Sequence, residues 1–144
     1  MITQISVYLE NVHGSLRSLT KTLAEDNIDL LALSIADTAN FGIVRLVVRE
    51  EAVTPAMYCL KEAGFIAKKN DVICVSVPNR PAGLDTVLAA VEAAGASVEY
   101  MYSFNYSLAG SALMILRLAD GCDAEKILRD GCITVVSQDE INRL

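Results

Sequence analysis

The chain contains one pattern twice. An Asn-x-x-x-x-Leu motif begins at Asn11 and begins again at Asn79, an offset of 68 residues (79 minus 11). The offset also holds for apolar positions on both sides of the motif: Ile5, Val7 and Leu9 correspond to Ile73, Val75 and Val77, and Leu16, Leu19 and Leu23 correspond to Leu84, Val87 and Val91. A shared register over this length indicates a duplicated module of about 70 residues. We therefore expect two domains, residues 1–70 and 71–144.

Each copy has the same predicted order of elements. Alternating apolar residues before the motif are typical of a half-buried strand, and the i, i+3, i+4, i+7 spacing after it predicts an amphipathic helix. Two further strands (residues 30–38 and 42–49; 98–106 and 112–118) flank turns at residues 40–42 and 109–110. A short helix capped by Thr54, with Pro55 in its first turn, or by Asp123, and a last strand (residues 65–69; 132–137) complete each copy.

The order strand, helix, strand, strand, helix, strand predicts an α+β fold made of two ferredoxin-like βαββαβ modules. Each module should form one antiparallel sheet with both helices on one face, because the crossovers are right-handed. Only Asn70 and Asp71 separate the last strand of the first copy from the first strand of the second. Asn27 and Gly95 stand just past the first helix of each copy, where a left-handed residue is favoured.

Composition excludes several function classes. Hydrophobic residues make up 53% and charged residues 21% of the chain, which predicts a globular protein. The net charge is −6 without a Lys/Arg stripe, so neither nucleic acid nor an anionic membrane surface is an expected partner. No segment reads as a signal peptide or reaches the ~18 apolar residues of a membrane span. We expect a cytoplasmic protein.

Sequence patterns for catalysis and metal binding are lacking. The four cysteines contain no C-x-x-C pair and the chain has one histidine, so we expect no metal site, no cofactor and free, mostly buried thiols. No nucleophile–base set, P-loop or paired carboxylates on one helix face indicate an enzyme.

The two motif loops are the candidate binding sites. Each loop precedes a helix whose first N–H groups lack intrahelical partners and favour an anionic group. Small residues, Gly14 and Ser15 or Ala82 and Gly83, would let a ligand approach. The alternative is that Asn, Gly and Pro here serve only as ordinary turn residues.

With this element order, loop motif and apolar stripe, each half resembles an ACT domain, a small-molecule-sensing module of amino-acid metabolism. The family pattern Asn/Asp-x-Pro-Gly-x-Leu is followed with His13 in place of Pro, and with the Gly-x order inverted at Ala82 and Gly83. The resemblance implies that an amino acid binds where these loops meet a neighbouring domain. The implied ligand-binding residues are Asn11, His13, Gly14, Ser15 and Leu16, and Asn79, Pro81, Ala82, Gly83 and Leu84.

The expected function is therefore reversible, regulatory binding of an amino acid by a homo-oligomer, most simply a dimer. One alternative is a regulatory subunit of a separate amino-acid biosynthetic enzyme such as acetolactate synthase. Another is a nucleic-acid or purely structural scaffold, since Tyr100, Tyr102, Phe104 and Tyr106 share one face of a predicted strand. For these aromatics we favour core packing or a dimer interface.

Overall fold

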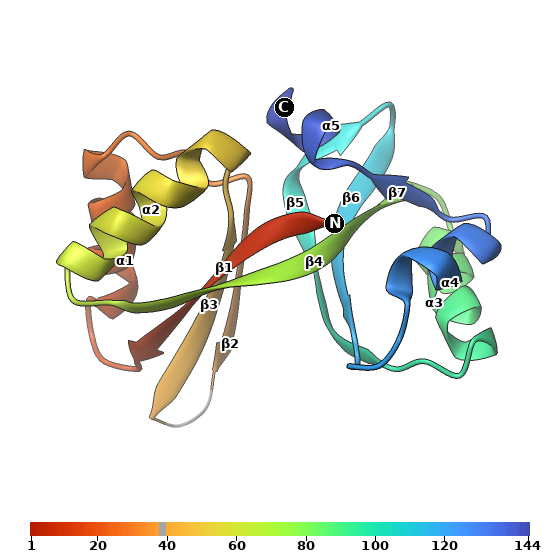
Figure 1. Ribbon diagram of the computed structural model, residues 1–144, viewed down its shortest axis with the longest axis horizontal. Coiled ribbons are helices and arrows are strands. Elements are labelled where there is room, and N and C mark those ends of the chain that lie inside the picture. Colours follow the sequence, from red (N-terminus) through yellow and green to blue (C-terminus); the bar gives the residue numbers. More distant parts are fainter. Residues whose placement is uncertain (38–39) are drawn as a thin grey trace. The chain divides into compact units, whose positions relative to one another are not determined.

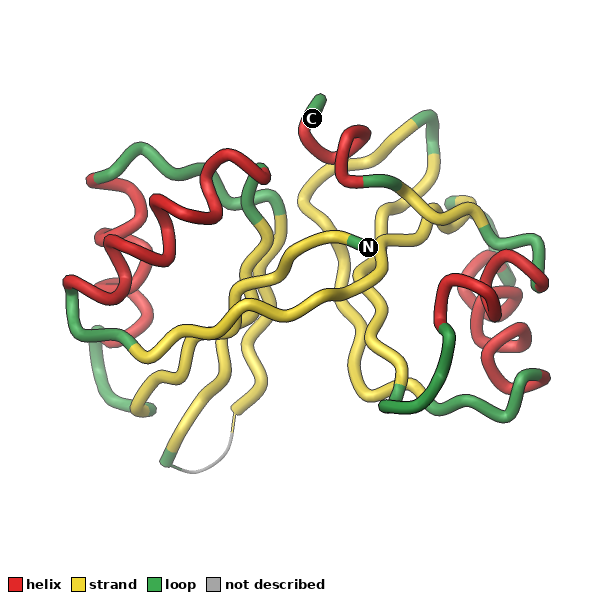
Figure 2. The backbone as a smooth tube through the Cα atoms, viewed as in Figure 1, coloured by secondary structure: helices red, strands yellow, loops and turns green. Residues whose placement is uncertain are grey.

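The computed structural model describes residues 1–37 and 40–144 and divides into two compact units. One unit is Thr3–Asp71, and the other combines Met1–Ile2 with Val72–Leu144. Strand β4 (Ile66–Pro78) contributes residues to both units as one uninterrupted element (Figure 2). The predicted break at Asn70 and Asp71 is therefore wrong, because both residues continue the strand.

The unit Thr3–Asp71 has the predicted βαββαβ order. It contains β1 (Ile2–Glu10), α1 (Ser15–Glu25), β2 (Ala32–Asp37), β3 (Phe41–Val47), α2 (Glu50–Glu62) and the first part of β4. Strand β3 pairs antiparallel with both β1 and β2, and β1 also pairs with β4. The end of the predicted strand at Thr38 lies outside the described residues.

Helices α1 and α2 cover one face of this sheet (Figure 1). The register places Val7 opposite Val44 and Val44 opposite Ile35, so alternate residues of three strands point to the helices. The predicted stripe of α1 supplies Leu19 and Leu23 to the same core, both at most 1% exposed. The buried core cluster consists of Ile5, Val7, Leu9, Leu19, Leu23, Ile28, Val44, Leu46, Val48, Val53, Ala56, Cys59 and Leu60.

The second unit repeats the order with one addition. After β4 come α3 (Gly83–Ala93), β5 (Val98–Leu108), β6 (Ser111–Leu118), α4 (Ala124–Asp130), β7 (Thr134–Val136) and α5 (Gln138–Asn142). Strand β6 pairs antiparallel with β4 and β5, and β4 pairs antiparallel with β7. The core cluster under α3 and α4 consists of Ile73, Val75, Val77, Val87, Val91, Leu116, Leu118 and Leu128. The ferredoxin-like prediction is confirmed for both units.

Strand β5 departs from the regular alternation expected for its aromatics. Three residues of β5 lie between Ser103 and Ser107, but only Leu113 of β6 lies between their partners Met114 and Ala112, so β5 bulges between these points. Before the bulge, Tyr100 and Tyr102 lie opposite Arg117 and Ile115, and their rings stack with centroids 6.5 Å apart. Met101, not the tyrosines, packs against the helix-side core. The tyrosine pair therefore lies on the sheet face opposite α3 and α4.

Two predictions about helix α2 and the preceding hairpin are wrong. Helix α2 begins at Glu50, with Glu50 and Glu51 in its first turn, so Thr54 is not a cap and Pro55 lies inside the helix. Carboxylates near a helix start are stabilised by the helix dipole, which explains the earlier start. Phe41 belongs to strand β3 rather than to the predicted turn, and Gly42 lies in the strand that was predicted to begin there. The predicted cap at Asp123 is confirmed, since its carboxylate accepts the Lys126 N–H at 3.1 Å.

Helix α5 was not expected from the sequence. It starts with a capping box in which Glu140 N–H donates to Ser137 Oγ at 3.3 Å and Ser137 N–H donates to Glu140 Oε2 at 2.8 Å. These hydrogen bonds lower the pKa of Glu140 below its ordinary value, the backbone bond from Ser137 being the largest cause. Ile141 anchors the helix and is fully buried.

Candidate functional site

Both motif loops enter a helix through a left-handed residue. Gly14 precedes α1 with φ of 83° and Ala82 precedes α3 with φ of 64°. In the described structure neither of these positions caps its helix with a side-chain hydrogen bond. The first turn of each helix therefore has backbone N–H groups without an intrahelical acceptor.

A cavity of about 140 Å³ lies at the loop of the first unit. It opens on the helix-covered side of the sheet, between the start of α1 and the paired ends of β1, β2 and β3. The residues that line it are Leu9, Glu10, Asn11, Val12, Ser15, Leu16, Ile35, Asp37, Gly42 and Val44.

Gly42 forms part of the cavity floor because it has no side chain. The register pairs Gly42 with Leu9 on one side and with Asp37 on the other. A Cβ at Gly42 would make only ordinary contacts, 3.7 Å from the Ala36 carbonyl oxygen and 4.0 Å from Ile35 Cγ2. The absence of a side chain at Gly42 therefore leaves this part of the lining open.

Several apolar side chains around the cavity remain exposed in the structure. Val12 is 60%, Ile35 is 48% and Leu16 is 39% exposed. Leu16 belongs to the apolar stripe of α1, whose other predicted members, Leu19 and Leu23, are buried. A ligand in the cavity would cover apolar surface that the unit itself does not cover.

A carboxylate is fixed at the rim. Asn11 Nδ2 donates to Asp37 Oδ1 at 3.1 Å and to Asp37 Oδ2 at 3.2 Å, and Asn11 N–H donates to the Asn40 carbonyl at 3.1 Å. Glu10 adds a second carboxylate. Among the described residues that line the cavity, none is a lysine, arginine or histidine. The described part of the rim therefore carries two carboxyl groups and no cationic side chain.

The start of α1 provides the opposite polarity. The first intrahelical bond runs from Ser18 N–H to the Gly14 carbonyl at 2.9 Å, so the amides of Leu16 and Arg17 precede the ladder and lack an intrahelical acceptor. The first turn of α1 contains no acidic residue. The positive end of the helix dipole is thus not neutralised by a side chain of that turn.

Three of the five predicted residues in the first loop, Asn11, Ser15 and Leu16, line the cavity. His13 and Gly14 lie in the same loop but outside the lining, and both are exposed. The hairpin of β2 and β3 contributes lining residues that were not predicted from the sequence, chiefly Ile35, Asp37 and Gly42. The sequence placed Ile35 and Asp37 in a strand and Gly42 where a turn meets the next strand, but no local pattern showed that these residues face the loop.

The second loop is built differently. A Cβ at Gly83 would collide with the carbonyl oxygen of Pro78, so the close approach at this glycine is to the chain's own backbone. Asp85 stands in the first turn of α3, where it partly neutralises the helix dipole. Asn79, Pro81, Ala82 and Leu84 are exposed around this contact.

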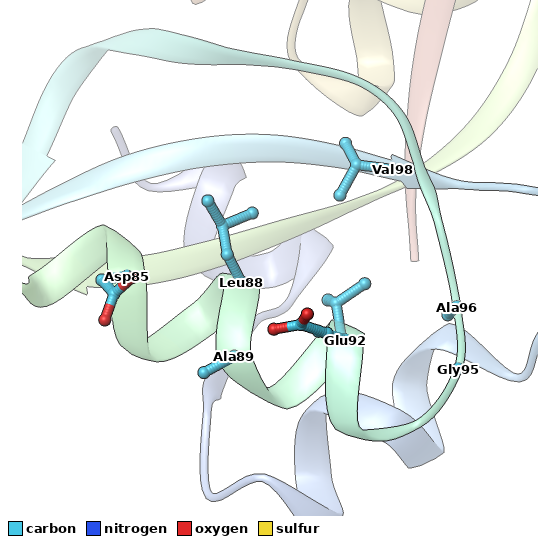
Figure 3. A pocket seen from close by; sticks show the side chains of 8 residues that line it. Asp85, Leu88, Ala89, Glu92, Gly95, Ala96 and Val98 are labelled. Atoms are coloured by element: carbon cyan, nitrogen blue, oxygen red, sulfur yellow. The ribbon is translucent and has the colours of Figure 1, made fainter.

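A wider depression of about 500 Å³ lies beside α3 (Figure 3). Leu88 and Glu92 of α3 and Val98 of β5 contribute to its lining, with Asp85 at one end. None of the five predicted residues of the second loop lines this depression. It is a shallow, acidic hollow along a helix and differs from the cavity at α1 in both place and form.

The cysteines are free thiols in two environments. Burial raises the pKa of Cys59 to about 11 and that of Cys74 to about 12, so both thiols are protonated at neutral pH. Cys122 and Cys132 are exposed, and the expectation of mostly buried thiols is wrong for these two. Within the described residues no group of three or more His, Cys, Asp or Glu side chains could hold a metal ion. No helix among them has the length and apolar character needed to cross a bilayer.

Similar solved structures span the chain almost completely. Protein BT0572 from Bacteroides thetaiotaomicron is 33% identical, with a TM-score of 0.87 over 99% of this chain and 96% of that one. The regulatory subunits of aspartate kinase from Thermus thermophilus and Thermus flavus are 18% and 19% identical, with TM-scores of 0.66 and 0.63. Each of the two alignments covers 90% of this chain, and 89% and 90% of the respective subunit. No curated protein matches the sequence.

The family model for the ACT domain pair matches residues 1–144, the whole of the sequence. This match agrees with the resemblance inferred from the duplicated loop and with the two βαββαβ units. The chain belongs to the ACT domain pair family.

Proposed function

We propose that this protein binds a free amino acid reversibly, as a regulatory signal and without chemical conversion, in the cavity at the start of α1. The observation that carries the proposal is the coincidence of that cavity with the loop of the repeated motif: Asn11, Ser15 and Leu16 line a hollow of about 140 Å³. Membership of the ACT domain pair family supports a regulatory role over a catalytic one.

Binding would act by covering exposed apolar surface at the junction of helix and hairpin. Val12 and Leu16 belong to the loop and helix, whereas Ile35 belongs to β2, so a ligand that contacts all three ties these elements together. The ligand shifts the population of conformations only by its difference in affinity between them. A partner that binds only the ligand-bound conformation would then respond to the ligand concentration.

The two loops are not equivalent in this proposal. The Pro78 carbonyl oxygen fills the space beside Gly83, and Asp85 places a carboxyl group in the first turn of α3. We therefore propose one ligand per chain, bound in the first unit, with the second loop serving as a packed turn. Isothermal calorimetry gives the stoichiometry directly, and two ligands per chain would contradict this part of the proposal.

The first experiment is a thermal-shift screen of the purified protein against the twenty amino acids. At a ligand concentration of 100 times the dissociation constant the stabilisation is about 2.7 kcal/mol, and it should grow with concentration by mass action. A flat result for all twenty amino acids at millimolar concentration would contradict the proposed function.

A second experiment places the ligand. Gly42→Val should abolish the ligand-induced shift, because its side chain fills the cavity from the floor while its Cβ makes only ordinary contacts. Ala36→Val is a matched control, because it adds bulk to an exposed position of β2 outside the cavity lining and should leave the shift unchanged. Retention of the full shift in Gly42→Val would exclude this cavity as the site.

A second candidate function is that of a regulatory subunit bound to a separate biosynthetic enzyme. Two solved structures with the same fold are described as regulatory subunits of aspartate kinase. Acetolactate synthase is another enzyme that such a subunit could serve. Affinity purification from extract should recover an enzyme in stoichiometric amount if this candidate holds, and the protein alone if the sensor is self-contained.

We also propose that the protein self-associates and is cytoplasmic. Exposed apolar side chains such as Tyr58 and Ile66, at 67% and 66% exposure, support association. Light scattering after size-exclusion chromatography distinguishes a dimer from a monomer of 15.5 kDa.

A further inference from the structure

We infer that the cavity at α1 selects zwitterionic amino acids with a short, uncharged aliphatic side chain. This inference rests on the proposed function and narrows its ligand class. It follows from three properties of the lining: its size, its apolar walls and the sign of the charges at its rim.

The size sets an upper limit on the buried group. A volume of about 140 Å³ is close to that of the engineered cavity of about 150 Å³ that holds one benzene molecule. A branched side chain of three or four carbons and the Cα atom fit such a space, with the polar main-chain atoms at the rim. A phenol or indole ring together with its Cβ and Cα is larger than this space and would extend out of it past the rim.

The walls favour an aliphatic group. Five of the lining side chains are aliphatic: Leu9, Val12, Leu16, Ile35 and Val44. Burial of a charged side chain among them would cost solvation that no wall residue replaces. An aliphatic side chain instead covers Val12, Leu16 and Ile35, which are exposed without a ligand.

The rim selects for a positive group. Asp37 and Glu10 provide two carboxylates, and Asn11 holds the Asp37 carboxylate in place through two hydrogen bonds of 3.1 and 3.2 Å. An ammonium group placed here gains charge-assisted hydrogen bonds, whereas a ligand with a net negative charge is repelled. Acidic amino acids are therefore excluded by the same residues that attract the α-ammonium group.

The ligand carboxylate belongs at the other end of the cavity. The amides of Leu16 and Arg17 have no intrahelical acceptor, and the first turn of α1 carries no acidic side chain. Leu16 and Asp37 both line the cavity, so a zwitterion can place its carboxylate toward the helix start and its ammonium toward Asp37. A single small molecule thus matches both polarities.

The test compares related probes by calorimetry on the full chain. Valine and isoleucine should bind, whereas aspartate, lysine and tryptophan should bind at least tenfold more weakly. Isovalerate keeps the aliphatic and carboxylate groups without an ammonium, and it should also lose at least tenfold in affinity. Equal binding of isovalerate and valine would overturn the inference.

Two substitutions test the rim. Asp37→Asn and Glu10→Gln should each weaken valine binding, Asp37→Asn by at least tenfold, with melting temperatures of the free proteins close to that of the original. Asp85→Asn is the control, since it removes the same charge from an exposed helix position outside the cavity lining and should leave affinity unchanged. Unchanged affinity in both rim variants would contradict the proposed role of the carboxylates.

The outcomes separate this inference from the function on which it rests. If lysine or an aromatic amino acid binds most tightly and Gly42→Val abolishes that binding, the ligand class is wrong and the sensor function stands. If no amino acid binds, both are wrong.

Discussion

The contact between Gly83 and the end of β4 predicts that even one methyl group at this position destabilises the second unit. In Gly83→Ala the new Cβ would overlap the Pro78 carbonyl oxygen and approach Val77 Cγ1 to 3.4 Å. The obstacle is backbone, so α3 must move away from the strand instead of letting a side chain rotate. Overpacking of this kind costs about 1–3 kcal/mol, and the helix preference of Ala over Gly returns at most about 1 kcal/mol. Subtracting the largest helix gain from the overpacking cost leaves an expected net loss of up to about 2 kcal/mol.

Urea unfolding followed by tyrosine emission measures this loss. The chain has no tryptophan and five tyrosines, and Tyr100, Tyr102 and Tyr106 belong to the unit that contains Gly83. The signal therefore reports mainly on the unit where the damage is expected. The variant should unfold at a lower urea concentration than the original protein.

Gly14→Ala is a comparison variant at the other helix start, in which backbone strain rather than a steric clash is the cost. A Cβ at Gly14 meets no atom within 4 Å, so the substitution costs only the strain of a left-handed alanine, about 1–2 kcal/mol at most. Ala82 already adopts that conformation at the equivalent position of the second loop. An unfolding midpoint of Gly83→Ala equal to that of the original protein would refute the argument that Gly83 serves helix packing.

Helix α5 and the four cysteines allow three further tests. Ser137→Ala should cost about 0.5–2 kcal/mol in urea unfolding, whereas Ser137→Gly should cost only a few tenths; equal losses would contradict the capping box. The pKa of Glu140 is lowered in the folded state, so its contribution to stability is present above its ordinary value of 4.5 and is lost as pH falls through the lower folded value. Glu140→Gln should therefore lose less stability on acidification than the original protein, as measured by thermal unfolding at stepped pH. A thiol reagent at pH 8 should modify Cys122 and Cys132 quickly, and Cys59 and Cys74 only after unfolding, because burial raises the pKa of the latter two. Rapid modification of all four in the folded protein would contradict this assignment.

Local sequence signals predicted much of the fold because they act within one element. Asn27 and Gly95 were assigned to helix ends, and both adopt left-handed conformations with φ of 55° and 69°. The apolar spacing identified α1 and α3 because it depends only on helix periodicity. Thr54 misled the prediction because a residue suited to capping is also tolerated inside a helix, and the start at Glu50 is favoured by two acidic residues.

The candidate site was harder to predict because it depends on pairing between segments. Gly42 becomes a cavity floor only through its register with Leu9 and Asp37, and no local pattern specifies that register. The bulge of β5 escaped prediction for the same reason, since it appears only when β5 is counted against β6. The loop motif predicted one wall of the cavity. The opposite wall is formed by the hairpin of β2 and β3, and its contribution could be identified only from the strand pairing.

The allocation of residues 1 and 2 to the second unit has a practical consequence for dissecting this protein. Ile2 is 2% exposed, and the ammonium group of Met1 contacts Glu125 Oε1 at 2.8 Å, although in the sequence both residues belong to the first copy of the repeat. Cleavage between residues 70 and 71 would give a C-terminal fragment that lacks Met1 and Ile2 of its compact unit. The same cut would divide strand β4 between the two fragments. The boundary of the sequence repeat therefore does not coincide with the division into compact units.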